Sequence, residues 1–228
     1  MTVSPSFLTR GAAAAAVGAG VLFIGVQIGH PPLEAATVAT NELIVRDALK
    51  MLMAILALAG ISGMYLSQVR RNGLLGLVGY LVLGAGYLLI ACMTYMATFV
   101  LPEVVASDAA FVDDVIAHIK GDTPAGDIGA LAVVLKVQDI CFLAGGLILG
   151  IALFRARVLA RWATVLLAVG GVITILLSVM PDAFYRLLAF PNGIALIWLG
   201  YSLWQSQRQL TDPTHDPDEA SPEHAAVP

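Results

Sequence analysis

Six long apolar stretches alternate with shorter polar connections along the chain. They cover about residues 11–30, 44–67, 74–101, 129–154, 161–180 and 183–205. Each has close to the roughly 20 residues that an α-helix needs to cross the hydrocarbon core of a bilayer. The pattern predicts an all-α, polytopic membrane bundle of six transmembrane helices that forms one domain over residues 1–208. Residues 209–228 are polar and acidic, which predicts a disordered cytoplasmic tail.

The distribution of basic residues predicts the orientation of the bundle. Arginines lie before the first stretch, in alternate connections and after the last stretch, and the other connections are mainly acidic. By the positive-inside rule, both termini lie in the cytoplasm and the protein is a multi-pass protein of the plasma membrane. The first stretch follows Arg10 and therefore also resembles a signal peptide. It lacks a small-residue cleavage site, which favours a retained helix.

The long connection between the third and fourth stretches carries a second helical pattern. Its apolar residues recur at helical spacing, at Phe111, Val112, Val115, Ile116 and Ile119. This spacing predicts a short amphipathic helix on the membrane surface or over the mouth of the bundle. Two interpretations stay open, a packed surface helix and a lid over a cavity.

Composition agrees with a membrane protein. Hydrophobic residues make up 59% of the chain and charged residues 12%, against about 45–50% and about 25% in soluble domains. A net charge of −4 argues against a nucleic-acid partner, which needs a basic face. Membrane lipid is the expected partner. Small residues recur on three stretches and predict close helix packing; they are Gly11, Ala15, Gly18, Ala19, Gly73, Gly76, Gly79, Gly84, Gly86, Gly145, Gly146 and Gly150.

Ionisable residues inside the apolar stretches are the strongest functional signal. Such groups are costly in a bilayer unless they are paired or wetted, so they mark a site by default. Their spacing permits Glu42–Arg46, Asp47–Lys50 and Lys136–Asp139 pairs. Lysine and arginine can instead extend to the headgroups, but the aspartate side chain is too short to do so. The set, placed in the outer half of the bundle, is Arg46, Asp47, Lys50, Lys136, Asp139 and Arg186.

A proline in the sixth stretch adds to this picture. Pro191 predicts a kink beside Asn192, with free carbonyls that need protein or a wet cavity around them. This point lies near the depth inferred for Asp139. Together the two features predict an outward-opening polar pocket. Residues of the third stretch that either line it or fill the bundle are Tyr87, Met93, Thr94, Tyr95 and Met96.

No cofactor chemistry is apparent in the sequence. His30 and His118 are the only histidines outside the tail, and neither has a carboxylate at metal-binding spacing, so neither a metal site nor a bis-histidine haem is expected. Phosphate-binding, nucleophile-elbow and intramembrane-protease patterns are also missing.

Two resemblances bear on function. The segments Leu153–Trp162 and Pro191–Trp204 resemble uncharacterised six-helix membrane proteins of high-GC bacteria, which implies a topology and no activity. In size, architecture and possession of a membrane acid, the chain is also loosely similar to the integral-membrane terpene cyclases. Their buried carboxylic acids protonate an olefin or an epoxide, and they rely on acids from more than one helix.

Three functions stay open at this point. The first is an enzyme for an isoprenoid-like substrate with Asp139 as general acid, which requires Lys136 to turn away from it. Polar substrate groups would be held by Arg46, Asp47, Lys50, Lys136, Arg186 and Asn192, and Tyr87 and Trp198 would stabilise a carbocation. The second is a binder or transporter of an anionic lipid or small acid. The third is a membrane scaffold or accessory subunit.

Overall fold

The described part of the protein is built from α-helices. The computed structural model describes residues 4–178 and 189–211, and no strand occurs among them. The long helices are α1 (Pro5–Gly25), α3 (Asn41–Leu66), α4 (Val69–Phe99), α7 (Ala130–Ala156), α8 (Arg161–Ser178) and α10 (Ala189–Thr211). The short ones are α2 (Ala35–Val38), α5 (Leu101–Val104) and α6 (Ala109–Lys120). Helices α1, α3 and α7, and the segment Val69–Val104, are long and apolar enough to cross a membrane.

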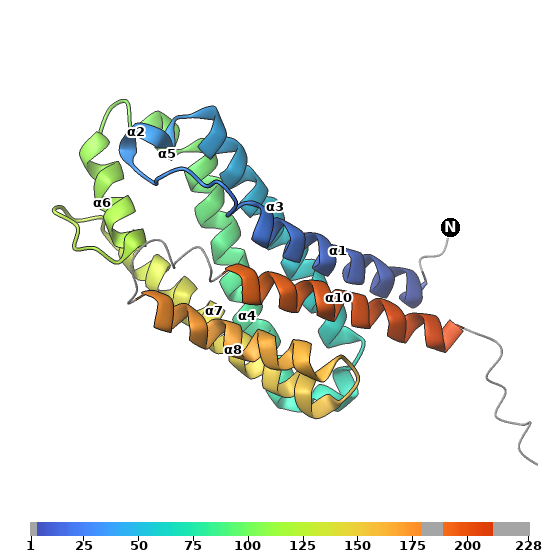
Figure 1. Cartoon of the computed structure of the whole chain (residues 1–228). Helices are drawn as coiled ribbons and strands as arrows, with labels where there is room; N and C mark the ends of the chain where they lie inside the picture. Colours follow the sequence, from blue (N-terminus) through green and yellow to red (C-terminus); the bar gives the residue numbers. More distant parts are fainter. Residues whose placement is uncertain (1–3, 179–188, 212–228) are drawn as a thin grey trace, which may run out of the picture.

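The six long helices form a closed ring. Each packs against the next in the order α1, α3, α4, α7, α8 and α10, and α10 returns to α1 (Figure 1). Most of the largest fully buried side chains, among them Tyr87, Leu149 and Leu196, belong to one core cluster at the centre of this ring, and the others, Leu43, Val112 and Val115, belong to a second cluster. Helices α8 and α10 therefore share a single core with the four segments that are long and apolar enough to cross a membrane.

One end of the ring is covered by the three short helices. Helix α2 packs on α3 and α6, α5 packs on α4 and α6, and α6 also packs on α7 (Figure 1). Helix α6 is the amphipathic helix that the sequence predicts, since Val112, Val115 and Ile116 are buried. It begins where Asp108 accepts a hydrogen bond from the backbone N–H of Phe111, at 3.0 Å. The prediction of a helix over this end of the bundle is confirmed.

Helix ends differ from the hydropathy boundaries because capping, and not hydropathy, sets them. Helix α1 begins at Pro5, six residues before the predicted start, because the Ser4 hydroxyl accepts from the N–H of Phe7 at 3.2 Å. Helix α4 begins at Val69 and is broken at Gly73, whose φ of 56° suits glycine. The predicted kink at Pro191 involves residues 183–188, which lie outside the described residues.

Glycines and alanines set the helix spacing, as predicted, but not at every predicted position. A Cβ at Gly79 of α4 would lie 2.5 Å from the backbone nitrogen of Leu149 on α7. On α1 the predicted stripe of Gly11, Ala15, Gly18 and Ala19 is right only in part. Ala19 is buried and a Cβ at Gly18 would meet Leu56 of α3 at 3.5 Å, whereas nothing lies within 4 Å of a Cβ at Gly11. The contacts to Gly60 and Gly63 of α3 are made by Ala16 and Ala12, one residue away on the same helix. Composition alone does not show which face of an alanine-rich helix turns inward.

Candidate functional site

Two adjoining cavities lie inside the covered end of the ring. The first, here called the inner chamber, has a volume of about 190 Å³ and is bounded by α1, α3, α4, α7 and α10. Its lining residues are Phe23, Val26, Gln27, Lys50, Met53, Ile90, Thr94, Gln138, Asp139, Phe142, Ala189 and Asn192. Half of these side chains are polar and half are apolar, which is the composition expected of a site for an amphipathic small molecule.

The second cavity, here called the outer chamber, has a volume of about 180 Å³ and lies under the short helices. Its walls include Val38 of α2, Leu101 of α5 and Ile116 of α6, together with Asp47 of α3. Lys50, Ile90, Thr94 and Gln138 line both chambers. The chambers are therefore neighbours, and α6 forms part of the wall of the outer chamber.

Lys50 is the centre of a hydrogen-bonded chain at the junction of the chambers. Its Nζ donates to Asp47 Oδ1 at 2.8 Å and lies 2.9 Å from Nε2 of His30. His30 Nδ1 lies 2.7 Å from the carbonyl oxygen of Pro31. Nε2 faces an ammonium, which can only donate, and Nδ1 faces a carbonyl oxygen, which can only accept. The tautomer of His30 that fits both partners therefore carries its proton on Nδ1 and accepts at Nε2. The predicted Asp47–Lys50 pair is confirmed, with Asp47 only 6% exposed.

Arg46 holds the chain that leaves α1. Its Nη1 donates to the carbonyl oxygens of Val26 and Ile28, and its Nη2 donates to that of Gly29, each at 3.0 Å. Its Nε and Nη2 also donate to Glu42, which confirms the predicted pair. These contacts satisfy carbonyls that follow the last turn of α1. A substrate role for Arg46 stays a prediction.

Asp139 borders the inner chamber and does not form the ion pair with Lys136 that their spacing permits. Within the part of the chain that the structure describes, no ion pair joins these two residues. Both side chains are exposed, and Lys136 lines neither chamber. A spacing of three residues permits a pair on a helix but does not impose one. Gln138 gives Asp139 a side-chain hydrogen bond, and the His118 imidazole of α6 lies near it.

The structure distributes the other predicted residues unequally. Asn192 lines the inner chamber and is 4% exposed. Tyr87 lies in the core, 1% exposed, with its ring edge-on to Phe142 at 5.5 Å. Trp198 is 42% exposed and lines neither chamber. Arg186 lies outside the described residues. Of the predicted set, the chambers therefore bring together Asp47, Lys50, Asp139 and Asn192.

Several lining residues were missed by sequence reasoning. The rings of Phe23 and Phe142 are stacked with centroids 6.4 Å apart, and both line the inner chamber. The Oε1 atom of Gln138 is buried there without a hydrogen-bond partner in the described chain. Gln138 and Phe142 lie one helical turn apart and flank Asp139, a signal that the sequence does contain. Phe23 lies on α1 and His30 lies in the connection that follows α1. No local sequence pattern predicts that Phe23 reaches the inner chamber or that His30 reaches Lys50.

Acidification is expected to destabilise the protein through His30. The pKa of His30 is lowered below its ordinary value of about 6.5, mainly by burial and then by the Lys50 ammonium, with a smaller contribution from Arg46. The hydrogen bond to Pro31 and the charge of Asp47 raise the pKa, but by less. The unfolded chain then binds more protons, so the stability contributed by neutral His30 is present above about pH 6.5 and is lost as the pH falls through the folded pKa. We expect the melting temperature in detergent to fall by a few degrees between about pH 7 and about pH 5.

The matched variant is His30→Gln, which keeps a carbonyl acceptor for Lys50 and removes the titration. Its melting temperature should fall less over the same range, because the remaining carboxyl groups still titrate in both proteins. Equal pH dependence in both proteins, measured by scanning fluorimetry, would show that His30 does not act in this way.

Comparison with known proteins identifies no relative of this chain. No protein-family model, no curated protein and no solved structure matches it.

Proposed function

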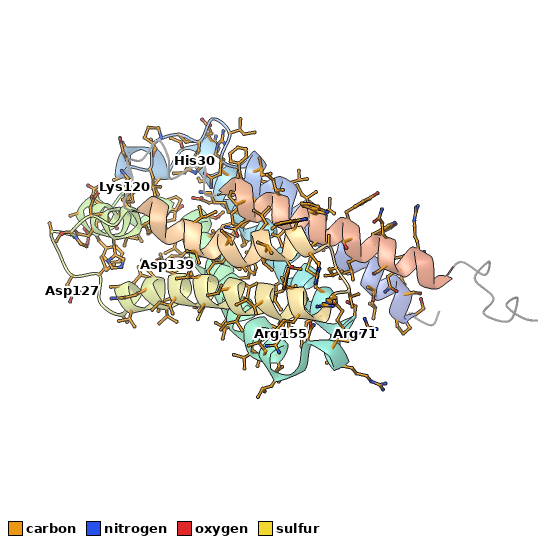
Figure 2. All side chains as sticks on the ribbon, turned by 60° about the horizontal axis from the view of Figure 1, so that its bottom comes forward. His30, Arg71, Lys120, Asp127, Asp139 and Arg155 are labelled. Carbon is orange, nitrogen blue, oxygen red and sulfur yellow. The ribbon has the colours of Figure 1, made fainter. Side chains whose placement is uncertain are left out.

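We propose that this protein is a six-span protein of the plasma membrane that binds a small isoprenoid-like molecule in the two chambers and acts on it by acid catalysis. Membership of α8 and α10 in the closed ring supports their assignment as the fifth and sixth spans. His30, Lys120 and Asp127 lie at one end of the bundle, and Arg71 and Arg155 lie toward the other (Figure 2). Basic connections at one end only support an orientation with both termini in the cytoplasm.

The observation that carries the proposal is the contrast between two carboxyl groups on different helices. Asp139 of α7 borders the inner chamber without an ion-pair partner in the described chain, whereas Asp47 of α3 is buried and paired with Lys50. Two carboxyl groups in different environments are the arrangement by which one site provides both an acid and a charged anchor. In the proposed reaction, protonated Asp139 transfers its proton to the olefin or epoxide as general acid, and its carboxylate then takes a proton from the cyclised cation, which restores the acid. The Asp47–Lys50 pair holds the polar end of the substrate.

The apolar wall supports the same chemistry. The stacked rings of Phe23 and Phe142 border the inner chamber beside Asp139, where their faces can stabilise positive charge on a carbocation. In this proposal, Phe23 and Phe142 have the carbocation-stabilising role that the sequence analysis expected of Tyr87 and Trp198. The chambers together reach the lower end of the range of about 300–1,000 Å³ that is typical of small-molecule sites. That volume suits the reacting portion of the substrate, and the rest of its apolar chain would extend into the bilayer.

A second function is favoured by Lys50. Its ammonium borders both chambers and lies against neutral His30, so it is suited to the headgroup of an anionic lipid or a small acid. In that case the protein is a binder or transporter, and Asp139 takes no part in chemistry.

Filling the junction of the chambers tests whether they hold a ligand. Thr94 of α4 lines both chambers, and Cys92 lies two residues away with an exposed side chain. We expect mass spectrometry of solvent extracts to find an apolar metabolite with the purified wild type, and Thr94→Phe to reduce its amount by about tenfold or more, since a benzyl group costs affinity of this order where space is lacking.

The control is Cys92→Phe, which adds a larger side chain to the same helix and should retain the metabolite. Bulk phospholipid alone in all three extracts would exclude a ligand site in the chambers. An anionic molecule that high salt removes would favour the second function over the first.

A further inference from the structure

One buried polar atom at the junction of the two chambers has no partner in the described chain. It is the side-chain oxygen Oε1 of Gln138, a residue that lines both chambers. Among the described residues that line a chamber, no other side chain has a buried nitrogen or oxygen atom without a hydrogen bond. An unpaired buried acceptor destabilises the folded protein. At the wall of a cavity, it indicates a ligand that supplies the missing donor.

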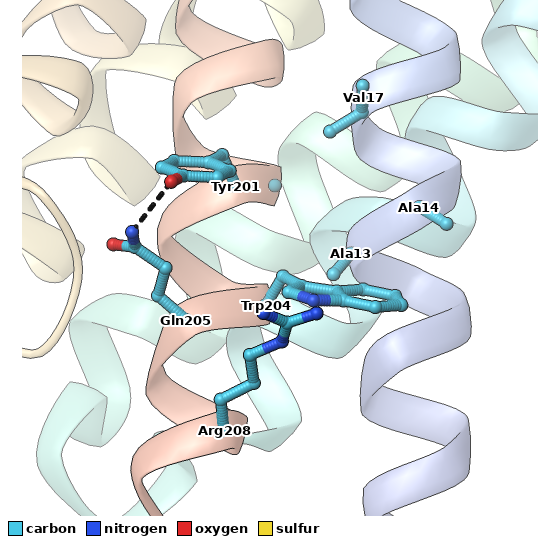
Figure 3. A pocket seen from close by; sticks show the side chains of 8 residues that line it. Ala13, Ala14, Val17, Tyr201, Trp204, Gln205 and Arg208 are labelled. Carbon is cyan, nitrogen blue, oxygen red and sulfur yellow. Dashed lines mark hydrogen bonds between the residues drawn. The ribbon is translucent and has the colours of Figure 1, made fainter.

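The amide nitrogen of Gln138 is used within the protein. Gln138 gives Asp139 a side-chain hydrogen bond, and in a glutamine side chain only the amide nitrogen can donate to a carboxylate. This bond determines which way round the amide lies, and it leaves Oε1 as the group without a partner. The amide of Gln205 is different. It is exposed in a separate groove between α1 and α10, and it donates to the hydroxyl of Tyr201 at 2.8 Å (Figure 3).

Lys50 offers a donor at the same junction. An ammonium group has three N–H donors. In the described chain two of them are used, by Asp47 Oδ1 at 2.8 Å and by Nε2 of His30 at 2.9 Å. The third donor is left for a ligand, since Lys50 lines both chambers. The hydroxyl of Thr94, which also lines both, donates to the carbonyl oxygen of Ile90 at 2.7 Å and therefore has no proton for Gln138.

We propose that the polar end of the ligand is a hydroxyl group, which donates to Oε1 of Gln138 and accepts from Nζ of Lys50. A hydroxyl group donates and accepts at a single atom, as this junction requires. An ether or epoxide oxygen and a carboxylate accept only, so each would leave Oε1 facing another lone pair. An ammonium ion donates only, and it would lie against the ammonium of Lys50.

The ligand is therefore an isoprenoid alcohol and not an isoprenoid acid. This inference rests on the proposed function, since it takes the chambers to hold an isoprenoid-like molecule, and it adds the functional group at the polar end of that molecule. A site built to bond a hydroxyl group rejects analogues that lack one, because its own buried polar group is then left unpaired. Gln138 is thus the residue that determines specificity.

Binding of three probes to the purified full-length protein tests this inference. The probes are geraniol, geranyl methyl ether and geranic acid, which carry the same hydrocarbon chain, and isothermal titration calorimetry in detergent measures their affinities. The wild type should bind geraniol about tenfold more tightly than the ether, because the ether leaves Oε1 unpaired. It should also bind geraniol more tightly than the acid. This comparison is made in one protein and does not depend on the folding of a variant.

Gln138→Met keeps a side chain of similar length and removes the amide oxygen. It should bind geraniol and the ether with nearly equal affinity, whereas a preference caused by the extra methyl group of the ether would persist in this variant. The matched control is Val137→Met, which places the same side chain on α7 at an exposed position that lines neither chamber. It should keep the tenfold preference of the wild type.

Three results would overturn the inference while the proposed function stands. They are equal affinity of the wild type for geraniol and the ether, tighter binding of geranic acid than of geraniol, and a preference for geraniol that Gln138→Met retains. A failure of the proposed function gives a different result. In that case none of the probes binds the wild type, or Thr94→Phe, which fills the junction, binds them as tightly as the wild type does, and the inference fails with it.

Discussion

Replacement of Asp139 by asparagine is expected to lower turnover by about 100- to 10,000-fold, the usual contribution of a positioned general acid. Asparagine has nearly the shape of protonated aspartic acid but cannot transfer a proton to a substrate. Because Asp139 forms no ion pair in the described chain, its replacement should leave the melting temperature and the ligand content unchanged. Turnover is measured with a panel of polyprenyl olefins and epoxides, by chromatography and mass spectrometry of the cyclised products.

Two variants serve as controls for this result. Asp139→Glu keeps the acid at a displaced position and should retain part of the activity. Lys136→Gln removes a charge one helical turn away that lines neither chamber, and it should be close to the wild type. Full turnover by Asp139→Asn would exclude acid catalysis by this residue and leave binding by Lys50 as the better explanation of the chambers.

The second large effect is on stability. Gly79→Ala is expected to lower the melting temperature by about 5–10 °C, because overpacking against rigid neighbours costs up to about 3 kcal/mol or more. The new methyl group would meet the backbone nitrogen and Cα of Leu149, at 2.5 and 2.7 Å. Backbone atoms cannot rotate away as a side chain can, so α4 and α7 must move apart along their whole contact. Scanning fluorimetry in detergent measures the change.

Gly84→Ala, five residues further along the same helix, is the matched control. The atom nearest to its new methyl group is Leu58 Cδ1 at 3.5 Å, an ordinary contact. Since alanine is also the better helix former by about 1 kcal/mol, the melting temperature should stay constant or rise slightly. A loss of equal size in both variants would mean that the helix spacing does not depend on the Gly79 contact.

The sequence predicts the fold well because the fold follows from local signals. Long apolar runs predict the long helices, and the spacing of Val112, Val115 and Ile116 predicts α6 and its buried face. Helix ends were predicted less well, since a single side chain such as Ser4 decides where α1 begins. The packing face of α1 was assigned only in part because nearly every residue on the helix is small, and only the neighbouring helices distinguish one face from another.

The site was predicted in part, for a physical reason. Spacing on one helix found the Asp47–Lys50 pair, yet the same spacing suggested a Lys136–Asp139 pair that does not form. The difference comes from other parts of the chain. Lys50 is fixed at a chamber wall by His30 of the connection after α1, 20 residues away in the chain, whereas no hydrogen bond joins Lys136 to another side chain in the described part of the protein. Residues of α1 that line the inner chamber, such as Phe23, cannot be predicted from local spacing, because their position depends on how α1 packs against the other helices.

The most direct measurement is a density map of the protein purified into lipid nanodiscs, at a resolution that shows side chains. The account predicts elongated density, continuous through both chambers, that touches the carboxyl group of Asp139 at one point and the ammonium of Lys50 at another. Chambers closed by repacked side chains, or an Asp139 carboxyl group turned to the headgroups with no density beside it, would contradict it.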